Sequence, residues 1–233
     1  MRLYRRWWET GQCASPRAWR ADRNPPSPPA CGGTRRVLPR TAFAASDPYA
    51  KVRAMPTSEH WQIPHIVDVL QRERPRTVLD VGAGWGKYGL LAREYADAER
   101  VDALDVIRPR YPVYDQVHIG DALDLDRVLP AEPARYDLAL LIDVIEHLEK
   151  ADGWRLLEAL TRRARRVLVA TPWGFRRQEI AGLPYETHRS GWYPWEFGRR
   201  YRAHLTRVFP GHYSRRLGLP RLWQILVLLG ARD

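Results

Sequence analysis

The sequence predicts an α/β fold with a doubly wound, mostly parallel β-sheet, and three observations support this prediction. Short apolar runs of strand length alternate with longer segments in which apolar residues recur at helical spacing. A glycine-rich turn joins the first apolar run to the helical segment after it. Near the C-terminus, two apolar runs follow each other without a helix between them, which favours an antiparallel final pair. Alternation of this kind is typical of a parallel sheet covered by helices.

The predicted elements begin with a helix after residue 60. Apolar side chains from Trp61 to Leu70 recur at helical spacing, and the pair Arg74 and Pro75 ends the pattern. The longest predicted helix runs from Ile145 to Arg163. Strand candidates are short apolar runs, at Thr77–Val81, Val101–Asp105, Gln116–Ile119, Tyr136–Ile142, Val167–Ala170, His204–Phe209 and Trp223–Leu229.

Residues 1–54 are predicted to form a disordered segment that precedes one folded domain over residues 55–233. The segment is rich in proline and arginine and shows neither helical nor strand periodicity. It holds 11 Lys and Arg against 3 Asp and Glu, and therefore most of the net charge of +11 of the 233-residue chain. Because the rest of the chain is nearly neutral, a nucleic-acid partner is not expected. Met55 is a candidate start of the functional protein.

Both cysteines of the chain, Cys13 and Cys31, lie in this N-terminal segment. We therefore expect neither a disulfide nor a cysteine-ligated metal site in the folded domain, and a reducing cytoplasm is the expected compartment. The segment has no apolar run long enough for a secretory signal. The late apolar stretch Leu222–Leu229 is interrupted by Gln224 and is shorter than the roughly 20 residues of a spanning helix, so we predict no transmembrane segment.

The turn after the first predicted strand is the first candidate binding site. It reads Asp80-Val81-Gly82-Ala83-Gly84-Trp85-Gly86-Lys87 and leads from a buried strand into a helix. Glycine permits unusual backbone angles and lets a ligand approach the backbone, while a helix N-terminus offers free N–H groups to an anionic end. A loop of this kind also serves simple strand-to-helix turning.

Two carboxylates follow at the ends of the next two predicted strands. Asp105 stands about twenty residues after the glycines, where a doubly wound sheet places an acid against ribose hydroxyls. Asp121, followed by Ala122, could accept a hydrogen bond from an exocyclic amine such as that of adenine. Alternatively, Asp105 is a solvated strand end and Asp121 caps a short helix. Together with the glycine turn, the two acids favour an adenosine-bearing ligand.

At these residues the sequence resembles the class I S-adenosylmethionine-dependent methyltransferases, over roughly residues 75–172. The run from Asp80 to Gly86 is similar to their first motif, Asp105 to their ribose-binding acid, the pair Asp121 and Ala122 to their adenine motif, and Tyr136–His147 to their fourth motif. The resemblance implies a Rossmann-like, seven-stranded sheet with an antiparallel last strand. It also implies S-adenosylmethionine as the cofactor, with Asp80, Gly82, Gly84 and Gly86 in its binding loop.

A nicotinamide-dependent oxidoreductase is an alternative interpretation of the same turn. The dinucleotide motif Gly-x-Gly-x-x-Gly requires two residues before its last glycine. In the frame that begins at Gly82, the third glycine comes too early, at Gly86. A shifted frame through Gly84, Gly86 and Gly89 does fit, so this alternative stays open but is the weaker one.

The segment Asp143-Val144-Ile145-Glu146-His147-Leu148 follows the fourth predicted strand and is expected to face the acceptor. It resembles the Asp-x-x-Glu-His-Leu variant of small-molecule methyltransferases of the quinone-biosynthesis type, which disfavours amide and exocyclic amine acceptors. A hydroxyl oxygen is the preferred acceptor atom. His147 is the first candidate for a general base, because histidine can accept a proton near neutral pH. Alternatively it is a helix-start residue without a chemical role. We expect Asp143 to support the cofactor or the acceptor, and no metal site is predicted.

A long polar and aromatic segment, about residues 173–198, follows the fifth predicted strand. Insertions of this length at the ligand edge are commonly lids or substrate pockets. We expect it to determine the choice of acceptor, with His188 as the second candidate base. Its aromatic side chains could instead only anchor the loop on the sheet.

The sequence therefore predicts methyl transfer from S-adenosylmethionine to a small molecule. Arg162, Arg163, Arg165 and Arg166 could instead bind RNA phosphates, which keeps RNA methylation as an alternative, although cations also favour the C-terminal end of a helix. A scaffold that binds the cofactor without turnover is a third possibility. The sequence does not indicate the oligomeric state.

Overall fold

The computed structural model describes residues 58, 60–133, 135–180, 183–213 and 219–232. The chain divides into two units, Met1–Ala45 and Ser46–Asp233, and all described residues belong to the second. The predicted disordered segment 1–54 and the candidate start at Met55 lie outside the described residues.

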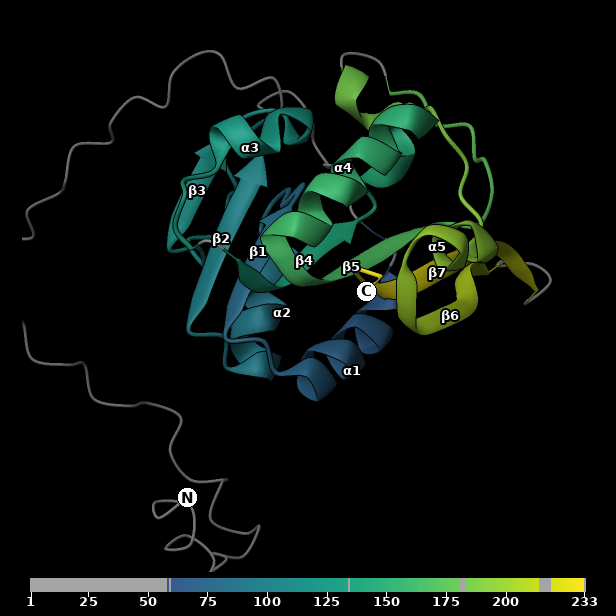
Figure 1. Ribbon diagram of the computed structural model, residues 1–233. Coiled ribbons are helices and arrows are strands. Elements are labelled where there is room, and N and C mark those ends of the chain that lie inside the picture. The colour runs from purple at the N-terminus through teal and green to yellow at the C-terminus, as the bar shows by residue number, and fades with distance from the viewer. Residues whose placement is uncertain (1–57, 59, 134, 181–182, 214–218, 233) are drawn as a thin grey trace, which may run out of the picture. The chain divides into compact units, whose positions relative to one another are not determined.

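A seven-stranded mixed sheet forms the centre of the second unit, with strand order β3-β2-β1-β4-β5-β7-β6 (Figure 1). Strand β7 pairs antiparallel with both of its neighbours, and the pairs among β1 to β5 are parallel. This confirms the predicted fold class. The strands are β1 Thr77–Val81, β2 Arg100–Asp105, β3 Gln116–Ile119, β4 Tyr136–Ile142, β5 Ala164–Pro172, β6 Arg202–Tyr213 and β7 Pro220–Gly230.

Helices cover both faces of this sheet, as Figure 1 shows. The α-helices are α1 Ile63–Glu73, α2 Lys87–Ala96, α3 Leu125–Val128, α4 Lys150–Arg163 and α5 Pro194–Arg200. Short 3-10 turns are η2 His60–Gln62, η3 Ala122–Asp124, η4 Ile145–His147 and η5 Pro184–Glu186. Helices α1 and α2 enclose one apolar core, and α3, α4 and α5 enclose the other. Neighbouring residues of a strand point to opposite cores, because Val78 belongs to the first and Leu79 to the second.

The predicted helix Ile145–Arg163 is wrong at its beginning. The chain makes the short turn η4, becomes extended at Leu148 and Glu149, and starts α4 only at Lys150. The physical reason is the extended backbone between the turn and the helix, with ψ 152° at Leu148 and ψ 148° at Glu149, which interrupts the helical hydrogen bonding. Buried Ile145 and Glu146 occupy the turn, and α4 then begins in a new direction.

The strand order places the functional candidates at one edge of the sheet. β1 pairs with β2 on one side and with β4 on the other, so the connections diverge at the carboxyl ends of β1 and β4. Open α/β sheets bind ligands at this position. Among the described residues, no helix is long and apolar enough to cross a membrane.

Candidate functional site

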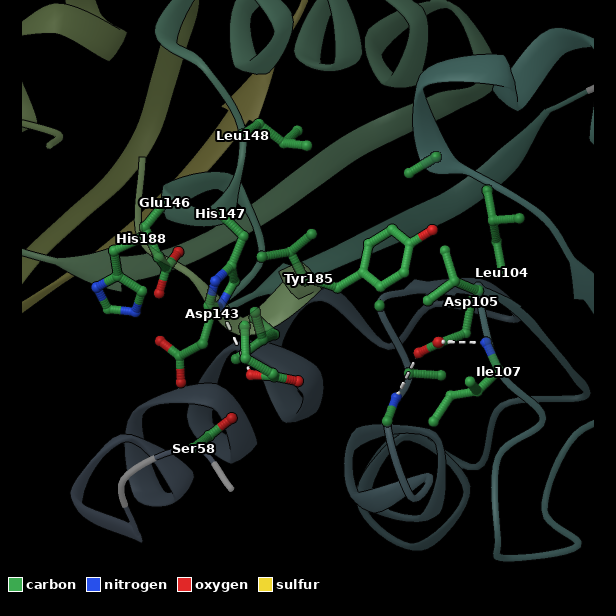
Figure 2. A pocket seen from close by; sticks show the side chains of 18 of the residues that line it. Ser58, Leu104, Asp105, Ile107, Asp143, Glu146, His147, Leu148, Tyr185 and His188 are labelled. Atoms are coloured by element: carbon green, nitrogen blue, oxygen red, sulfur yellow. Dashed lines mark hydrogen bonds and ion pairs between the residues drawn. The ribbon is translucent and has the colours of Figure 1, made fainter. Parts of the chain in front are cut away.

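A cavity of about 1240 Å³ opens at the carboxyl edge of the sheet (Figure 2). The loops after β1, β2, β3, β4 and β5 line it, and a segment between residues 176 and 189 adds a further wall. Its volume exceeds the roughly 300–1,000 Å³ of a common small-ligand pocket, so it has room for two ligands. Around it stand seven carboxylates, of Asp105, Asp121, Asp143, Glu146, Glu149, Asp152 and Glu186, and three cationic side chains, of Lys87, Arg176 and Arg189.

Most of the residues predicted from the sequence meet in this cavity. Those that line it are Gly82, Gly84, Asp105, Asp121, Ala122, Asp143, His147 and His188. Asp80 and Gly86 are placed beneath the lining. Asp80 is almost fully buried, and Gly86 is the residue that precedes the first turn of α2. These two residues therefore shape the loop without lining the cavity.

The glycine turn closely contacts the loop after β4. Gly82 has φ +72°, and a Cβ atom added there would lie 2.2 Å from Cγ2 of Val144. Only glycine combines this backbone conformation with so close a neighbour. Gly82 therefore lets the turn after β1 pack directly against the segment that carries the candidate acceptor residues.

Asp105 connects the glycine turn to the loop after β2. Its Oδ2 accepts a hydrogen bond from the backbone N–H of Gly84 at 2.8 Å, and Oδ1 accepts one from Ile107 at 2.9 Å. Figure 2 shows both bonds. Burial raises the pKa of Asp105. A carboxylate has about four lone-pair sites, so Asp105 keeps acceptor capacity for ribose hydroxyls.

Asp80 has a partner that the sequence pattern did not reveal. The hydroxyl of Tyr114 donates a hydrogen bond of 2.6 Å to its Oδ2. Burial raises the pKa of Asp80 to about 7, against the lowering effect of this hydrogen bond. The same tyrosine ring lies against Gly86 and Gly89, where an added Cβ would come within 3.2 Å and 2.3 Å of it. Tyr114 therefore supports the glycine turn from beneath.

Asp121 caps the 3-10 turn η3. Its Oδ1 accepts a hydrogen bond from the backbone N–H of Leu123 at 2.9 Å. This is the helix-capping alternative considered from the sequence, and the residue lines the cavity as well. Capping leaves further lone pairs on the exposed carboxylate, so it is compatible with ligand binding.

Asp143 is held by Gln62, which the sequence analysis missed. Nε2 of Gln62 donates to Oδ2 of Asp143 at 2.7 Å and also lies 2.8 Å from the hydroxyl of Tyr88. Gln62 is fully buried although it directly precedes α1. The contact anchors the loop after β4 to the turn η2, directly before α1.

The two predicted histidines lie next to each other. Their ring centroids are 4.8 Å apart in an edge-to-face arrangement. Nδ1 of His147 lies 3.3 Å from the carbonyl oxygen of Thr187, and Nδ1 of His188 lies 2.8 Å from that of Arg176. Burial, followed by the neighbouring His188, lowers the pKa of His147 to about 4, and burial also lowers the pKa of His188. Both imidazoles are therefore neutral at pH 7.

Glu146 stands beside the histidines and is a further residue that the sequence analysis did not assign to the site. It is 3% exposed, and its Oε2 accepts a hydrogen bond of 3.0 Å from the hydroxyl of Thr171. Burial, together with the negative charge of Asp143, raises its pKa well above the ordinary value. Its backbone carbonyl accepts the N–H groups of Arg189 and Ser190, at 2.7 Å and 3.1 Å.

The segment after β5 is anchored at both of its ends. Trp173 and Gly174 form isolated bridges with Trp192, whose side chain is fully buried in the core next to Phe197. Between these anchors, the side chain of Tyr185 is 60% exposed. Oε2 of Glu186 lies 4.0 Å from Nε2 of His147. The aromatic anchoring expected as an alternative therefore does occur, while the middle of the segment lines the cavity.

Comparisons with known proteins relate the chain to methyltransferases through its fold. No protein-family model and no curated protein matches the sequence. Solved structures do match. The 1,6-didemethyltoxoflavin-N1-methyltransferase of Burkholderia thailandensis, solved with bound 1,6-didemethyltoxoflavin and S-adenosylhomocysteine, has 19% identity and a TM-score of 0.55, over 75% of this chain and 80% of that one.

Two further structures give the same result. The N-methyltransferase NodS of Bradyrhizobium japonicum WM9, in complex with S-adenosylhomocysteine, has 11% identity and a TM-score of 0.50, over 73% of this chain and 87% of that one. A protein of Listeria monocytogenes described as an S-adenosylmethionine-dependent methyltransferase has 12% identity and a TM-score of 0.52, over 72% and 97%. The fold is thus the Rossmann-like fold found in class I methyltransferases.

Proposed function

We propose that the protein transfers a methyl group from S-adenosylmethionine to a small-molecule acceptor, with a hydroxyl oxygen as the preferred atom. One observation carries the proposal. The glycine turn after β1 and the acid at the end of β2 are joined at 2.8 Å on one wall of a cavity that has room for a cofactor and an acceptor. The matching structures with bound S-adenosylhomocysteine support the same cofactor.

The cofactor would lie across the carboxyl ends of β1, β2 and β3. Asp105 would accept hydrogen bonds from the ribose hydroxyls, and Asp121 with Ala122 would meet the adenine edge. The methionine part would lie against Gly82 and Gly84, towards Asp143. Asp80 and Gly86 would contribute by shaping the turn, since both lie beneath the lining.

The acceptor would bind on the other side of the cavity, where Figure 2 shows Glu146, His147 and His188 together and Asp105 apart from them. In the reaction, the acceptor oxygen forms a bond to the methyl carbon as the carbon–sulfur bond breaks. The electron pair of that bond stays on sulfur, which becomes neutral, and the hydroxyl proton leaves. Holding donor and acceptor in line supplies much of the rate. His147 is the first candidate to take the proton and His188 the second, because both are neutral.

The geometry favours this function over a nicotinamide-dependent oxidoreductase. The shifted frame that fits the dinucleotide motif uses Gly86 and Gly89, and both pack against the ring of Tyr114. Of the glycines in this turn, Gly82 and Gly84 line the cavity, and Gly84 is the only one of the three glycines of the shifted frame that does so. The fingerprint of a pyrophosphate site is therefore not presented to the ligand.

The geometry also disfavours RNA as the acceptor. The arginine cluster lies around the end of α4 and the start of β5, at the edge of the sheet opposite the cavity. Arg162 forms ion pairs with Asp126 at 3.2 Å and with Glu158 at 3.5 Å. The cluster therefore lies away from the cavity in which we place the reaction, and Arg162 is paired within the protein itself. We propose the cytoplasm as the compartment.

Two measurements test the proposal on the full-length protein. Calorimetry should show binding of S-adenosylmethionine in preference to NAD. Incubation with a panel of hydroxylated small molecules should release S-adenosylhomocysteine, and His147→Ala should lower that turnover at least tenfold. Cofactor binding without release for any acceptor would support the non-catalytic scaffold, and binding of NAD alone would overturn the assignment.

A further inference from the structure

Three side chains on the acceptor side of the cavity form a cluster with the composition of a metal site. One ligand atom each from Glu146, His147 and His188 lies within 4.8 Å of the others. Two come from the turn η4 after β4, and the third comes from the segment after β5. Figure 2 shows the three side chains gathered at one side of the pocket.

The hydrogen bonds of the two histidines prepare them as ligands. A backbone carbonyl can only accept, so the carbonyl oxygens of Thr187 and Arg176 require a proton on the Nδ1 atom that faces each of them. Nε2 of each ring then keeps its lone pair. Metal-binding histidines almost always donate their other ring N–H in this manner, which fixes the tautomer and the ring orientation.

The carboxylate of Glu146 is oriented in a comparable way. It is 3% exposed, and the hydroxyl of Thr171 donates to one of its oxygens at 3.0 Å. A second acid, Glu186, brings its Oε2 to 4.0 Å from Nε2 of His147. Carboxylate oxygens and imidazole nitrogens are both common ligands of divalent metal ions, so the two acids add oxygen donors beside the two rings.

We propose that Glu146, His147 and His188 bind one divalent transition-metal ion. Two imidazoles and a carboxylate suit Zn²⁺ or Mn²⁺ better than Ca²⁺ or Mg²⁺, which prefer oxygen ligands. Three protein ligands leave a coordination position for a substrate, as in catalytic zinc sites. At the tetrahedral angle, two bonds of about 2.1 Å place their ligand atoms roughly 3.4 Å apart. Binding therefore requires the ligand atoms, which now lie within 4.8 Å of one another, to move closer by up to about 1.4 Å.

The role of the ion rests on the proposed function, whereas its binding does not. An acceptor hydroxyl on the open position has a lowered pKa and gives up its proton more readily. That proton passes to the Glu186 carboxylate, the oxygen attacks the methyl carbon, and the carbon–sulfur electron pair stays on sulfur. In this description the two histidines act as ligands and the ion replaces a histidine base.

The test measures metal binding directly, without cofactor or acceptor. The full-length chain with Cys13→Ser and Cys31→Ser, which removes thiols outside the described residues, is titrated with Zn²⁺ by calorimetry and with Co²⁺ by visible absorption. We expect one ion per chain. His188→Gln and Glu146→Gln should each weaken binding at least tenfold, and His204→Gln, which changes an exposed histidine on β6, should leave it unchanged.

The outcomes separate this proposal from the proposed function. Absence of binding, or equal binding by His188→Gln and the parent protein, overturns the metal site. Because Glu146 is buried, thermal unfolding of Glu146→Gln accompanies the titration, and His188→Gln decides the matter if Glu146→Gln does not fold.

Methyl transfer at full rate in excess chelator also overturns the metal role but upholds methyl transfer. Metal binding without any release of S-adenosylhomocysteine upholds the site and counts against the enzyme assignment.

Discussion

The backbone N–H of Gly84 donates a hydrogen bond of 2.8 Å to the carboxylate of Asp105. The bond joins the turn after β1 to the end of β2, two strands that lie next to each other in the sheet. The turn is therefore set in its conformation before a ligand arrives, and the acid that holds it also faces the cavity.

Replacing Asp105 should weaken cofactor binding. Asp105→Asn removes the charge and one acceptor oxygen, and charge-assisted hydrogen bonds contribute about 1.5–3 kcal/mol each. We expect the affinity for S-adenosylmethionine, measured by calorimetry, to fall at least tenfold. Asp126→Asn is a matched control, because this exposed acid pairs with Arg162 away from the cavity. Equal affinities of the two variants would contradict the proposed role of Asp105.

Gly82→Ala should destabilise the fold. A left-handed backbone costs an L-residue about 1–2 kcal/mol, and the new Cβ would overlap Val144. We expect urea unfolding to show a loss of more than about 2 kcal/mol. Gly198→Ala, in α5 with nothing within 4 Å of an added Cβ, should cost nothing. Adding Val144→Ala to Gly82→Ala should recover the overlap part of the loss only.

Tyr114→Phe should cost stability through Asp80. The ring still packs against Gly86 and Gly89, but the buried acid loses its 2.6 Å donor. We expect a loss of about 1–3 kcal/mol in the free energy of unfolding and a pKa of Asp80 above the present value of about 7. Tyr95→Phe, on the exposed side of α2, serves as the control. A loss of the same size in both variants would show that the Asp80 contact is not responsible.

The low pKa of His147 makes stability depend on pH. Its pKa is about 4 in the folded protein and about 6.5 in the unfolded chain, so the unfolded chain binds more protons between these values. The free energy of unfolding should therefore fall as the pH decreases from 6.5 to 4, by about 3 kcal/mol for this group.

Denaturant titrations across this pH range on the protein and on His147→Gln isolate the effect. Asp80, whose pKa is raised from 3.8 to about 7, acts in the opposite direction over the same pH range, so the difference between the two proteins is the quantity to compare. The variant should lose less stability on acidification. Parallel pH curves would show that His147 is not held neutral by burial.

The fold could be predicted because its signals are local. Most strands contain a short apolar run, and the glycines of the first turn stand where β1 gives way to α2. The antiparallel end of the sheet followed from two apolar runs without a helix between them. The break before α4 escaped prediction because the apolar spacing from Ile145 continues across it, whereas the extended backbone at Leu148 and Glu149 leaves no periodic signal.

The contacts that orient the site could not be predicted from the sequence. Gln62 reaches Asp143 across 81 residues and Tyr114 reaches Asp80 across 34, and neither belongs to a pattern. The sequence places Glu146 in the segment after β4. Its contact with Thr171 depends on the pairing of β4 with β5, which the sequence spacing does not reveal. Sequence spacing indicates which groups reach the ligand edge, and tertiary packing determines which of them touch.

The excess of carboxylates around the cavity has a consequence for turnover. An environment of this sign holds a positively charged ligand more tightly than a neutral one of the same shape. The sulfonium donor of the proposed function would lose its charge at the moment of reaction, so the spent nucleoside would be released more easily than the fresh one. On that proposal the wall favours exchange of used for new cofactor, and added salt should narrow the gap between the two affinities.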